Sequence, residues 1–433
     1  MSRALSPSAG DDIQIDGGMA TRLLDELAAR TADAPGVTRA AYGEGERFAH
    51  ALVRREGEAL GLAASTDAAG NLYLTLPGRN PALPGWIVGS HLDSVPHGGN
   101  YDGAAGVVAG LLAVEALISA GLHPQRSVTV MAIRAEESNW FPVSYLGSRA
   151  AFGVLPPESL HLRRSDSGQT LADFMSEEGF RPEAVAAGER HLDPARIHAF
   201  VEVHIEQGPV LEAAKLPVGL VTAIAGSFRY RQARCLGAWG HSGAVPRAHR
   251  RDTVFALAEL VTALDRLWGE TLAGGEEATV TLGEVGTDRT LHGFSTIPGA
   301  VAFSLDVRSS SPACVERLHQ SLLAIVAEIE TRRGVRFELG TRTQSQPAIL
   351  SPVLRQSFAA TARAASIPTI EMMSGAGHDT ATFANQGVPA ALLFVRNQNG
   401  SHNPDEAMRI EDLLVAAELV ARRIAADDEE PMP

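Results

Sequence analysis

The order of the expected strands and helices changes twice along this 433-residue chain, and that change constrains the fold more than any other feature. Up to residue 213, short β-rich runs alternate with helical patterns. The elements expected there are the strands 86–90, 127–134 and 199–204 and the helix 102–122. Such alternation is typical of βαβ units, which build an α/β fold: a mostly parallel sheet with helices on both faces.

Between residues 214 and 343 the order becomes strand, helix, strand, strand, helix, strand. The elements expected there are 218–237, 252–269, 279–285, 301–309, 312–333 and 336–341. This βαββαβ order predicts a ferredoxin-like α+β domain. The alternation of helices and strands then returns, with the helix 352–365, the strand 390–395 and the helix 410–426. We therefore expect residues 1–213 and 344–433 to form one domain, into which residues 214–343 are inserted.

The formal net charge of −14 disfavours a surface that binds nucleic acid, because such surfaces need clustered Lys and Arg. An acidic protein can still bind an anionic substrate through a specific arginine or through backbone N–H groups. We therefore expect no nucleic-acid partner, and a particular arginine in the pocket if the substrate carries a carboxylate.

Three features favour a cytoplasmic protein. Only Cys235 and Cys314 are present, too few for a disulfide framework, and both are expected in the core. The segment Met1 to Gly18 lacks the basic and apolar regions of a secretory signal. No segment reaches the ~20 apolar residues of a membrane span, so we expect no membrane partner. The acidic end 427–430 is expected to be solvated.

Four polar clusters follow expected strands or helices, and ligands of open α/β sheets bind at the ends of the parallel strands. The first cluster contains His91, Asp93 and Asp102. His91 and Asp102 can each reach a metal ion, and Asp93 can orient the imidazole of His91. A structural histidine and an N-cap role for Asp102 are the alternatives that this pattern leaves open.

The second cluster is the pair Glu136 and Glu137 at the end of the strand 127–134. Adjacent side chains at a strand end point to opposite sides. One carboxylate can therefore bind a metal while its neighbour faces the substrate as a general base. Two exposed glutamates in a loop are the alternative.

The third cluster lies along the strand 199–204, where Glu202, His204 and Glu206 alternate and so share one side. Burying them would be costly unless a cation or another partner satisfied them. The fourth cluster is the loop 399–406, which contains His402 and has an ordinary surface loop as its alternative.

Taken together, the clusters offer a ligand set of nitrogen and oxygen atoms without thiolates, which suits Zn²⁺, Mn²⁺ or Co²⁺. The members of this set are His91, Asp102, Glu137, His204 and His402. If one carboxylate is shared, five such residues can serve two ions. A bridging Asp102 would hold those ions about 3.5–4 Å apart, the spacing of two-metal hydrolases.

Seven motifs in a fixed order resemble a known family. They are GSHLDSV, GGNYDG, AEES, HIEQG, GHSGAVP, SGAGHD and SHNPDE. In this order they resemble the M20-type metal-dependent amidases of the N-carbamoyl-L-amino-acid hydrolase and allantoate amidohydrolase group. The resemblance extends from about Gly85 to Glu406. HIEQG and GAGHD are the more specific motifs, because related peptidases usually carry an acidic residue at the position of His204.

The resemblance implies an M20 peptidase-like catalytic domain, an inserted lid and dimerisation domain, and a homodimer. It also implies two divalent ions per subunit, with Zn²⁺ expected first and Mn²⁺, Co²⁺ or Ni²⁺ acceptable. One ion would be held by His91, Asp102 and His204. The other would be held by Asp102, Glu137 and His402.

The catalytic roles implied by the resemblance belong to Glu136, Asp93 and His241. Glu136 would take a proton from the attacking water and pass it to the departing nitrogen. Asp93 would support His91, and His241 would reach across a dimer interface to the reaction centre. A solvated loop histidine is the alternative for His241.

Substrate binding is expected from a further group of residues. They are Gln207, Arg308, Ser295, Gly375, Gly377 and His378. Arg308 would form a bidentate pair with a substrate carboxylate, unless it forms only a surface ion pair. His378 would contact the substrate or only order its loop.

Two positions depart from the family pattern. Ser295 stands where the family often has Asn, so one hydrogen-bond donor is shortened or absent. Trp140 lies where many relatives carry a basic residue before Phe, and it is either a core residue or the lining of an apolar pocket.

The sequence thus predicts a hydrolase of linear C–N bonds, with an N-carbamoyl-L-amino acid as the leading substrate. Allantoate or ureidoglycolate is the alternative ureido acid, and an N-acyl amino acid or a dipeptide is the more distant alternative. A metal-free binding or scaffold protein that keeps the fold is the competing hypothesis from a different class.

Overall fold

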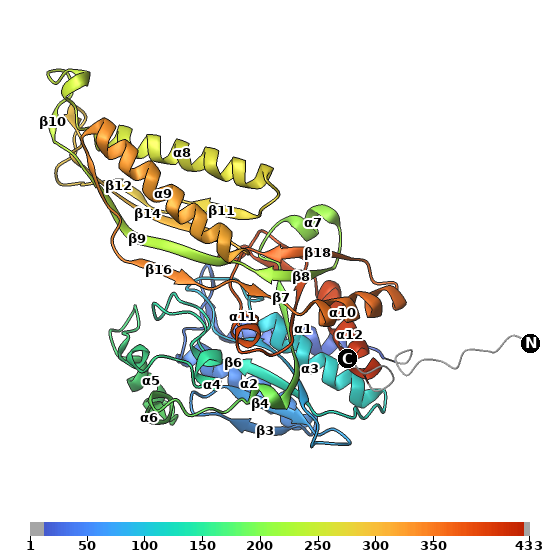
Figure 1. Cartoon of the computed structure of the whole chain (residues 1–433). Coiled ribbons are helices and arrows are strands. Elements are labelled where there is room, and N and C mark those ends of the chain that lie inside the picture. Colours follow the sequence, from blue (N-terminus) through green and yellow to red (C-terminus); the bar gives the residue numbers. More distant parts are fainter. Residues whose placement is uncertain (1–12, 428–433) are drawn as a thin grey trace, which may run out of the picture. The chain divides into compact units, whose positions relative to one another are not determined.

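The computed structural model describes residues 13–427, which form two compact units (Figure 1). Unit 1 contains the chain up to Thr222, the segment Leu350–Met372 and the chain from His378 onward. Unit 2 contains Ala223–Ile349 and the short segment Met373–Gly377. The chain therefore leaves unit 1, builds most of unit 2, and then returns to unit 1.

The larger sheet has nine strands among the residues that the structure describes. In order across the sheet they are β17 (Ala348–Ile349), β8 (Val218–Ile224), β19 (Ala390–Val395), β7 (Ile197–Ile205), β5 (Gly85–His91), β6 (Val128–Ile133), β4 (Leu72–Leu76) and β3 (Ala63–Thr66), with β18 (Thr369–Ser374) beside β8. The four strands from β19 to β6 are parallel to one another. The strands β8, β4 and β3 run antiparallel to their neighbours. The sheet is thus mixed, and the prediction of a mostly parallel sheet holds only for its centre.

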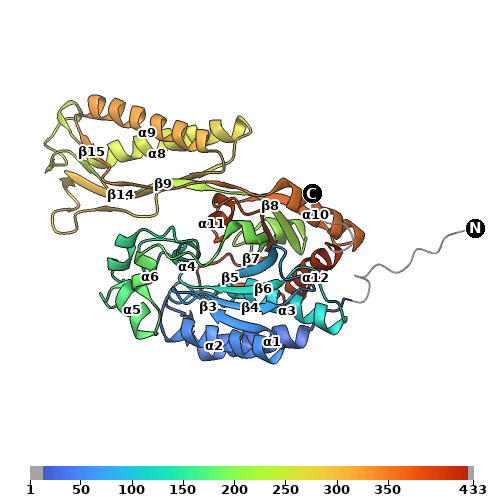
Figure 2. The same ribbon diagram turned by 60° about the horizontal axis from the view of Figure 1, so that its bottom comes forward.

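Helices cover both faces of this sheet (Figure 2). The helix α3 (Ala104–Ser119) is apolar almost all round and is buried up to its last turn, as expected for a helix without a polar face. With it on one face lie α1 (Gly17–Arg30), α2 (Glu44–Ala59), α10 (Pro352–Ala364) and α12 (Ile410–Ala426). On the opposite face Phe383 of α11 (Thr380–Asn385) stacks on Phe200 of β7. The alternation of buried side chains along the central strands is what gives the sheet two apolar faces.

The segment 218–237, expected to be one strand, is two strands in different sheets. β8 ends at Ile224 in the large sheet, and β9 (Gly226–Leu236) begins the smaller sheet of unit 2. The prediction failed because only Ala225 separates the two strands, so the β-rich run shows no break.

Unit 2 follows the order strand, helix, strand, strand, helix, strand. Its main elements are β9, α8 (Thr253–Ala273), β11 (Ala278–Thr281), β14 (Ala300–Ser309), α9 (Pro312–Arg333) and β15 (Arg336–Glu338). The strands lie in the order β11-β14-β9-β15, and each pair is antiparallel. The shorter strands β12 (Val285–Thr287) and β16 (Arg342–Ser345) pair with β14 and β9. Both helices pack on one face of this sheet, against Phe228 and Leu305.

The remaining elements are short. They are β1 (Ala32–Asp33), β2 (Gly36–Val37), α4 (Leu146–Ala151), α5 (Leu171–Glu177), α6 (Pro182–Ala186), α7 (Val210–Ala214), β10 (Gly240–His241), β13 (Thr296–Ile297), β20 (Asn397–Gln398), β21 (Ala407–Met408) and the 3₁₀ turns Pro157–His161, Pro194–Arg196 and Arg247–His249.

Three further predictions can be compared with the structure. Cys235 and Cys314 are free and buried, and burial raises the pKa of Cys235 to about 12. No helix within residues 13–427 is both long enough and apolar enough to cross a bilayer. Asp427 is not solvated but buried among cations, whereas residues 428–430 lie outside the described part of the chain.

Candidate metal centre

The ends of three neighbouring strands carry the polar clusters. His91 is the last residue of β5, His204 lies near the end of β7, and Glu136 follows the end of β6. Because these strands are adjacent and parallel, their carboxyl ends meet at one edge of the sheet. The turn before α3 adds Asp102, and the loop before α12 adds His402.

The two carboxylate oxygens of Asp102 face two different groups of side chains. Oδ1 lies 3.4 Å from Nε2 of His91 and 3.0 Å from Nε2 of His204. Oδ2 lies 3.3 Å from Nε2 of His402, and this same nitrogen lies 3.2 Å from Oε1 of Glu137. Each group of three could hold one metal ion, with Asp102 common to both.

The protonation of two imidazoles supports a cation at this position. Nδ1 of His91 lies 3.0 Å from the carbonyl oxygen of Asp93, and Nδ1 of His204 lies 2.8 Å from that of Ile205. A carbonyl oxygen can only accept, so in the neutral imidazoles Nδ1 carries the proton and Nε2 presents a lone pair to Asp102. Burial acts to lower the pKa of both histidines, but their hydrogen bonds to Asp102 outweigh it and raise the pKa. Each Nε2 can therefore face the carboxylate either with a proton or, in the neutral ring, with a lone pair that is free to bind a metal ion. The donor set therefore fits a divalent metal.

Asp102 is not the N-cap of α3, which was the alternative. The cap position is Gly103, with φ +65°, and a Cβ there would lie 2.5 Å from the ring of His91. The carboxylate of Asp102 instead accepts hydrogen bonds from Nε2 of Gln207 at 2.9 Å and from Oγ of Ser401 at 2.7 Å. Gln207, which was expected to bind substrate, thus donates a hydrogen bond to the carboxylate that both ligand groups share.

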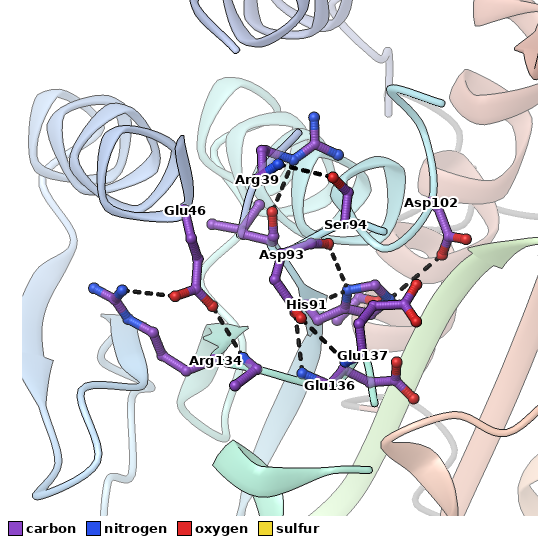
Figure 3. A network of polar contacts seen from close by, with 12 residues as sticks. Arg39, Glu46, His91, Asp93, Ser94, Asp102, Arg134, Glu136 and Glu137 are labelled. Carbon is purple, nitrogen blue, oxygen red and sulfur yellow. Dashed lines mark hydrogen bonds and ion pairs between the residues drawn. The ribbon is translucent and has the colours of Figure 1, made fainter. Parts of the chain in front are cut away.

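Asp93 connects the first histidine to the glutamate pair (Figure 3). Its Oδ1 lies 3.3 Å from Nδ1 of His91. The same carboxylate accepts the backbone N–H groups of Glu136 and Glu137, each at 3.0 Å. Asp93 therefore orients an imidazole and also fixes the backbone of both glutamates.

Glu136 and Glu137 are buried, so the alternative of exposed loop glutamates is wrong. Burial raises the pKa of both carboxyl groups, that of Glu136 well above its usual range. Burial also acts to raise the pKa of Asp102, but the three imidazoles around it outweigh burial and hold it well below its usual range. Hydrogen bonds to Asp102 and Glu137 raise the pKa of His402 to about 11. Asp102 and Glu137 have imidazoles as ion-pair partners.

Glu202 and Glu206 are also buried, but hydrogen-bond donors satisfy them. Glu202 accepts from Oγ of Ser90 and from the backbone and hydroxyl of Thr380. Glu206 accepts from two N–H groups at the start of α7. Of the three polar residues that share this side of β7, only His204 faces Asp102.

His378 and Trp140 are both buried core residues in unit 1. The ring of His378 packs 4.4 Å from that of His204, and burial holds its pKa well below the usual range. Trp140 lies in an apolar cluster and donates from Nε1 to the carbonyl of Ser94 at 2.7 Å. Trp140 is therefore part of the core rather than the lining of a pocket.

The other expected site residues belong to unit 2, whereas the five candidate metal ligands belong to unit 1. The guanidinium of Arg308 pairs with Asp306 at 2.8 Å and donates to the carbonyl of Gly375 at 2.9 Å. His241 is exposed, and its Nδ1 accepts from the N–H groups of residues 243 and 244. Ser295 is exposed in a loop. The roles expected for these residues, and for Gly377, stay predictions.

Several buried residues around the centre were not singled out from the sequence. Arg39 donates to the carbonyls of Leu92 and Asn100 and so joins the two loops that carry His91 and Asp102. Glu406 accepts the N–H groups of residues 101 and 102. Arg39 gives no periodic or motif signal, whereas Glu406 lies in the SHNPDE motif and could have been considered.

Comparison with known proteins places the chain in a family. The family described as "Peptidase family M20/M25/M40" matches residues 87–426. The chain belongs to this family. The resemblance stated from the motifs is thereby confirmed, and with it the prediction of a hydrolase.

Two curated relatives and one solved structure are similar to the chain over most of its length. An N-carbamoyl-L-amino acid amidohydrolase of Geobacillus stearothermophilus is 36% identical, covering 89% of this chain and 92% of the relative. An allantoate amidohydrolase of Bacillus subtilis is 32% identical, covering 86% of this chain and 88% of the relative. A crystal structure of a hydantoinase/carbamoylase family amidase from Burkholderia multivorans superimposes with a TM-score of 0.87 at 28% identity, covering 97% of this chain and 99% of that one.

Proposed function

We propose that this chain is a two-metal amidohydrolase that cleaves the carbamoyl C–N bond of an N-carbamoyl-L-amino acid. One observation carries the proposal: both oxygens of Asp102 face imidazole nitrogens, with Glu136 buried nearby. The 36% identical relative, which is named for this activity, supports the choice of substrate. With one water consumed, the products are the amino acid, ammonia and carbon dioxide.

The proposed ligands of one ion are His91, Asp102 and His204, and those of the other are Asp102, Glu137 and His402. Zn²⁺ suits this set of nitrogen and oxygen atoms, and Mn²⁺, Co²⁺ or Ni²⁺ would also be accepted. Two bound ions would polarise the substrate carbonyl and lower the pKa of the attacking water.

Glu136 is the proposed general base. Its carboxylate accepts the proton of the water that attacks the carbonyl carbon and then delivers that proton to the departing nitrogen. Burial raises the pKa of Glu136, and a neighbouring cation would act to lower it again. Asp93 holds the backbone N–H groups of Glu136 and its neighbour and so limits where this carboxylate can lie.

Six further residues are proposed to bind the substrate. Arg308 would exchange its pair with Asp306 for the carboxylate of the substrate, with Gln207, Ser295, His378 and the loop of Gly375 and Gly377 as further contacts. Arg308→Lys should raise KM more than it lowers kcat, because an ammonium cannot form the bidentate pair.

We also propose that unit 2 is a ferredoxin-like domain that acts as a lid and as a dimerisation domain. The enzyme is proposed to be cytoplasmic. Because Nδ1 of His241 accepts two hydrogen bonds, the proton of the neutral ring lies on Nε2. This Nε2–H group could donate a hydrogen bond to a group in a partner subunit. A homodimer is therefore expected in sedimentation, and a fully active monomer would contradict it.

Allantoate is the second candidate substrate, favoured by the 32% identical relative named for that activity. It carries the same ureido group and a carboxylate, so the same residues would act on it. Ureidoglycolate is a third ureido acid of this kind, and an N-acyl amino acid or a dipeptide would need the same base without ammonia release from a ureido group.

The test is ammonia release from N-carbamoyl-L-amino acids, β-ureidopropionate, allantoate and ureidoglycolate. The chain is assayed as purified, after removal of metal, and after reloading. We expect activity on one ureido acid that disappears on metal removal and returns on reloading. No ammonia release from any compound of this panel, together with hydrolysis of N-acyl amino acids, would overturn the substrate assignment.

A further inference from the structure

The turn that carries the two glutamates, residues 134–137, has an unusual set of backbone partners. Strand pairing of β6 stops at Ile133, and from there four successive N–H groups are bound by side-chain oxygens. The acceptors are Asn71 for Arg134, Glu46 for Ala135, and Asp93 for Glu136 and Glu137, at 2.9, 2.9, 3.0 and 3.0 Å. All three acceptor side chains are buried. The position of the turn is therefore set by side chains from elsewhere in unit 1.

Ala135 is the residue of this turn whose backbone conformation is least favourable. Its φ of +53° lies in the left-handed region, which disfavours residues with a Cβ atom. The conformation breaks the extended path of β6 immediately before Glu136, so it decides where Glu136 and Glu137 point. Its N–H is held by Oε1 of Glu46.

Glu46 is itself held by a buried ion pair. Its Oε2 accepts from Nη1 of Arg134 at 2.9 Å and from the N–H of Tyr42 at 2.6 Å. Figure 3 shows Glu46 between the guanidinium of Arg134 and the turn that leads to Glu136. Arg134 has a second buried carboxylate partner, Glu178, at 3.1 Å. Glu178 contacts the guanidinium of Arg134, whereas the backbone N–H groups of the turn have Asn71, Glu46 and Asp93 as their acceptors.

From these contacts we infer that Glu46 is a positioning residue for the reaction. It touches neither the candidate ligand groups nor the reacting atoms. It holds Ala135 in the left-handed conformation and so directs Glu136 as the base and Glu137 as the ligand. Glu46 lies outside the residues 87–426 matched by the family, so it is a contribution of the preceding segment of the chain. The inference deepens the proposed function and rests on it for the roles of Glu136 and Glu137.

The central variant is Glu46→Gln. An amide must turn its oxygen either to the N–H of Ala135 or to Arg134, so it cannot keep both contacts. The matched control is Glu178→Gln. It removes a carboxylate from the same guanidinium and leaves the hydrogen bonds to the backbone N–H groups of the turn unchanged. A third variant, Glu46→Gln with Ala135→Gly, makes the left-handed conformation accessible without Glu46.

We expect Glu46→Gln to lower kcat about tenfold or more while KM changes less than about twofold, the size of effect seen when groups behind metal ligands are lost. Glu178→Gln should lower the melting temperature comparably and leave kcat within about twofold. The added Ala135→Gly should restore most of the lost kcat. Equal losses of kcat in the two single variants, or no recovery with Ala135→Gly, would overturn the inference and leave Glu46 with a purely structural role.

A second readout does not depend on the substrate. Titration of Zn²⁺ into the metal-stripped chain should show that Glu46→Gln weakens binding of one of two ions about tenfold, since Glu137 is a proposed ligand, whereas Glu178→Gln binds like the wild type. If the wild type hydrolyses no ureido acid but this difference in affinity is found, the proposed function fails and the positioning role survives. Identical metal affinities in both variants would contradict the positioning role.

Discussion

The two ends of the central parallel strands both hold buried charge, but they balance it differently. At the amino ends Asp427 is surrounded by Arg126, His198 and Arg423, at 3.1, 3.4 and 3.1 Å. At the carboxyl ends Asp102 and Glu137 have imidazoles as partners, and Glu136 is buried beside them. Buried carboxylates are costly unless paired. The first end is thus balanced by arginine and histidine side chains, whereas the second has the donor set of the proposed metal centre.

The largest effect on turnover at the carboxyl ends of the strands is expected from Glu136→Gln. The amide keeps the size of the side chain but cannot accept a proton, so turnover should fall about 100- to 10,000-fold. The metal content should stay that of the wild type, because Glu136 is not a proposed ligand. Ammonia release and elemental analysis measure both quantities. Retained turnover would remove Glu136 from the role of base.

An intermediate effect is expected from Asp93→Asn. One oxygen of the carboxylate is replaced by an NH₂ group, which cannot accept a hydrogen bond from the N–H of Glu136 or of Glu137. We expect a loss of about 10- to 100-fold in kcat or in metal affinity, with the fold intact by circular dichroism. Wild-type values of both would show that the backbone of the glutamate pair needs no support from Asp93.

The smallest effect on activity is expected at the amino ends, from Asp427→Asn. Although burial acts to raise the pKa of Asp427, its cationic neighbours outweigh it and lower the pKa to about 2, from an ordinary value of 3.8. A depressed pKa stabilises the fold above the ordinary value, and this contribution disappears as the pH falls through about 2. The variant should therefore lose about 2 kcal/mol of stability at pH 7 and about half of that at pH 3.

Denaturant unfolding at the two pH values checks this prediction for Asp427→Asn, and kcat with the proposed substrate is measured beside it. The variant should keep the turnover of the wild type. A fall in kcat at unchanged stability would mean that the charge at the amino ends contributes to the reaction, and it would break the contrast between the two ends.

The sequence was most informative where chemistry requires particular residue types. The five candidate ligands stand in motifs at strand ends or in loops before helices, and the parallel centre of the sheet brings the strand ends together. The helices 312–333, 352–365 and 410–426 were predicted to within a residue, because caps and periodicity mark their ends.

The rest depended on contacts between residues distant in sequence. Glu46 holds the backbone of Ala135, and Arg39 holds that of Leu92 and Asn100, yet neither side chain differs in the sequence from an exposed charge on a helix or a turn. The change of sheet at Ala225 was missed for a similar reason, since one residue separates the two strands and only their different partner strands assign them to different sheets. Tertiary partners, rather than local pattern, decide these features.

The central claim is that the carboxyl ends of the strands form a centre for two cations. Titration of Zn²⁺ into the metal-stripped wild type and into His204→Ala, followed by calorimetry, tests it most directly. The account predicts two ions per wild-type chain, and in the variant a loss of affinity at one site of more than about 100-fold, since a ligand should cost more than a group behind it. No binding by the wild type, or equal binding by both proteins, would contradict it.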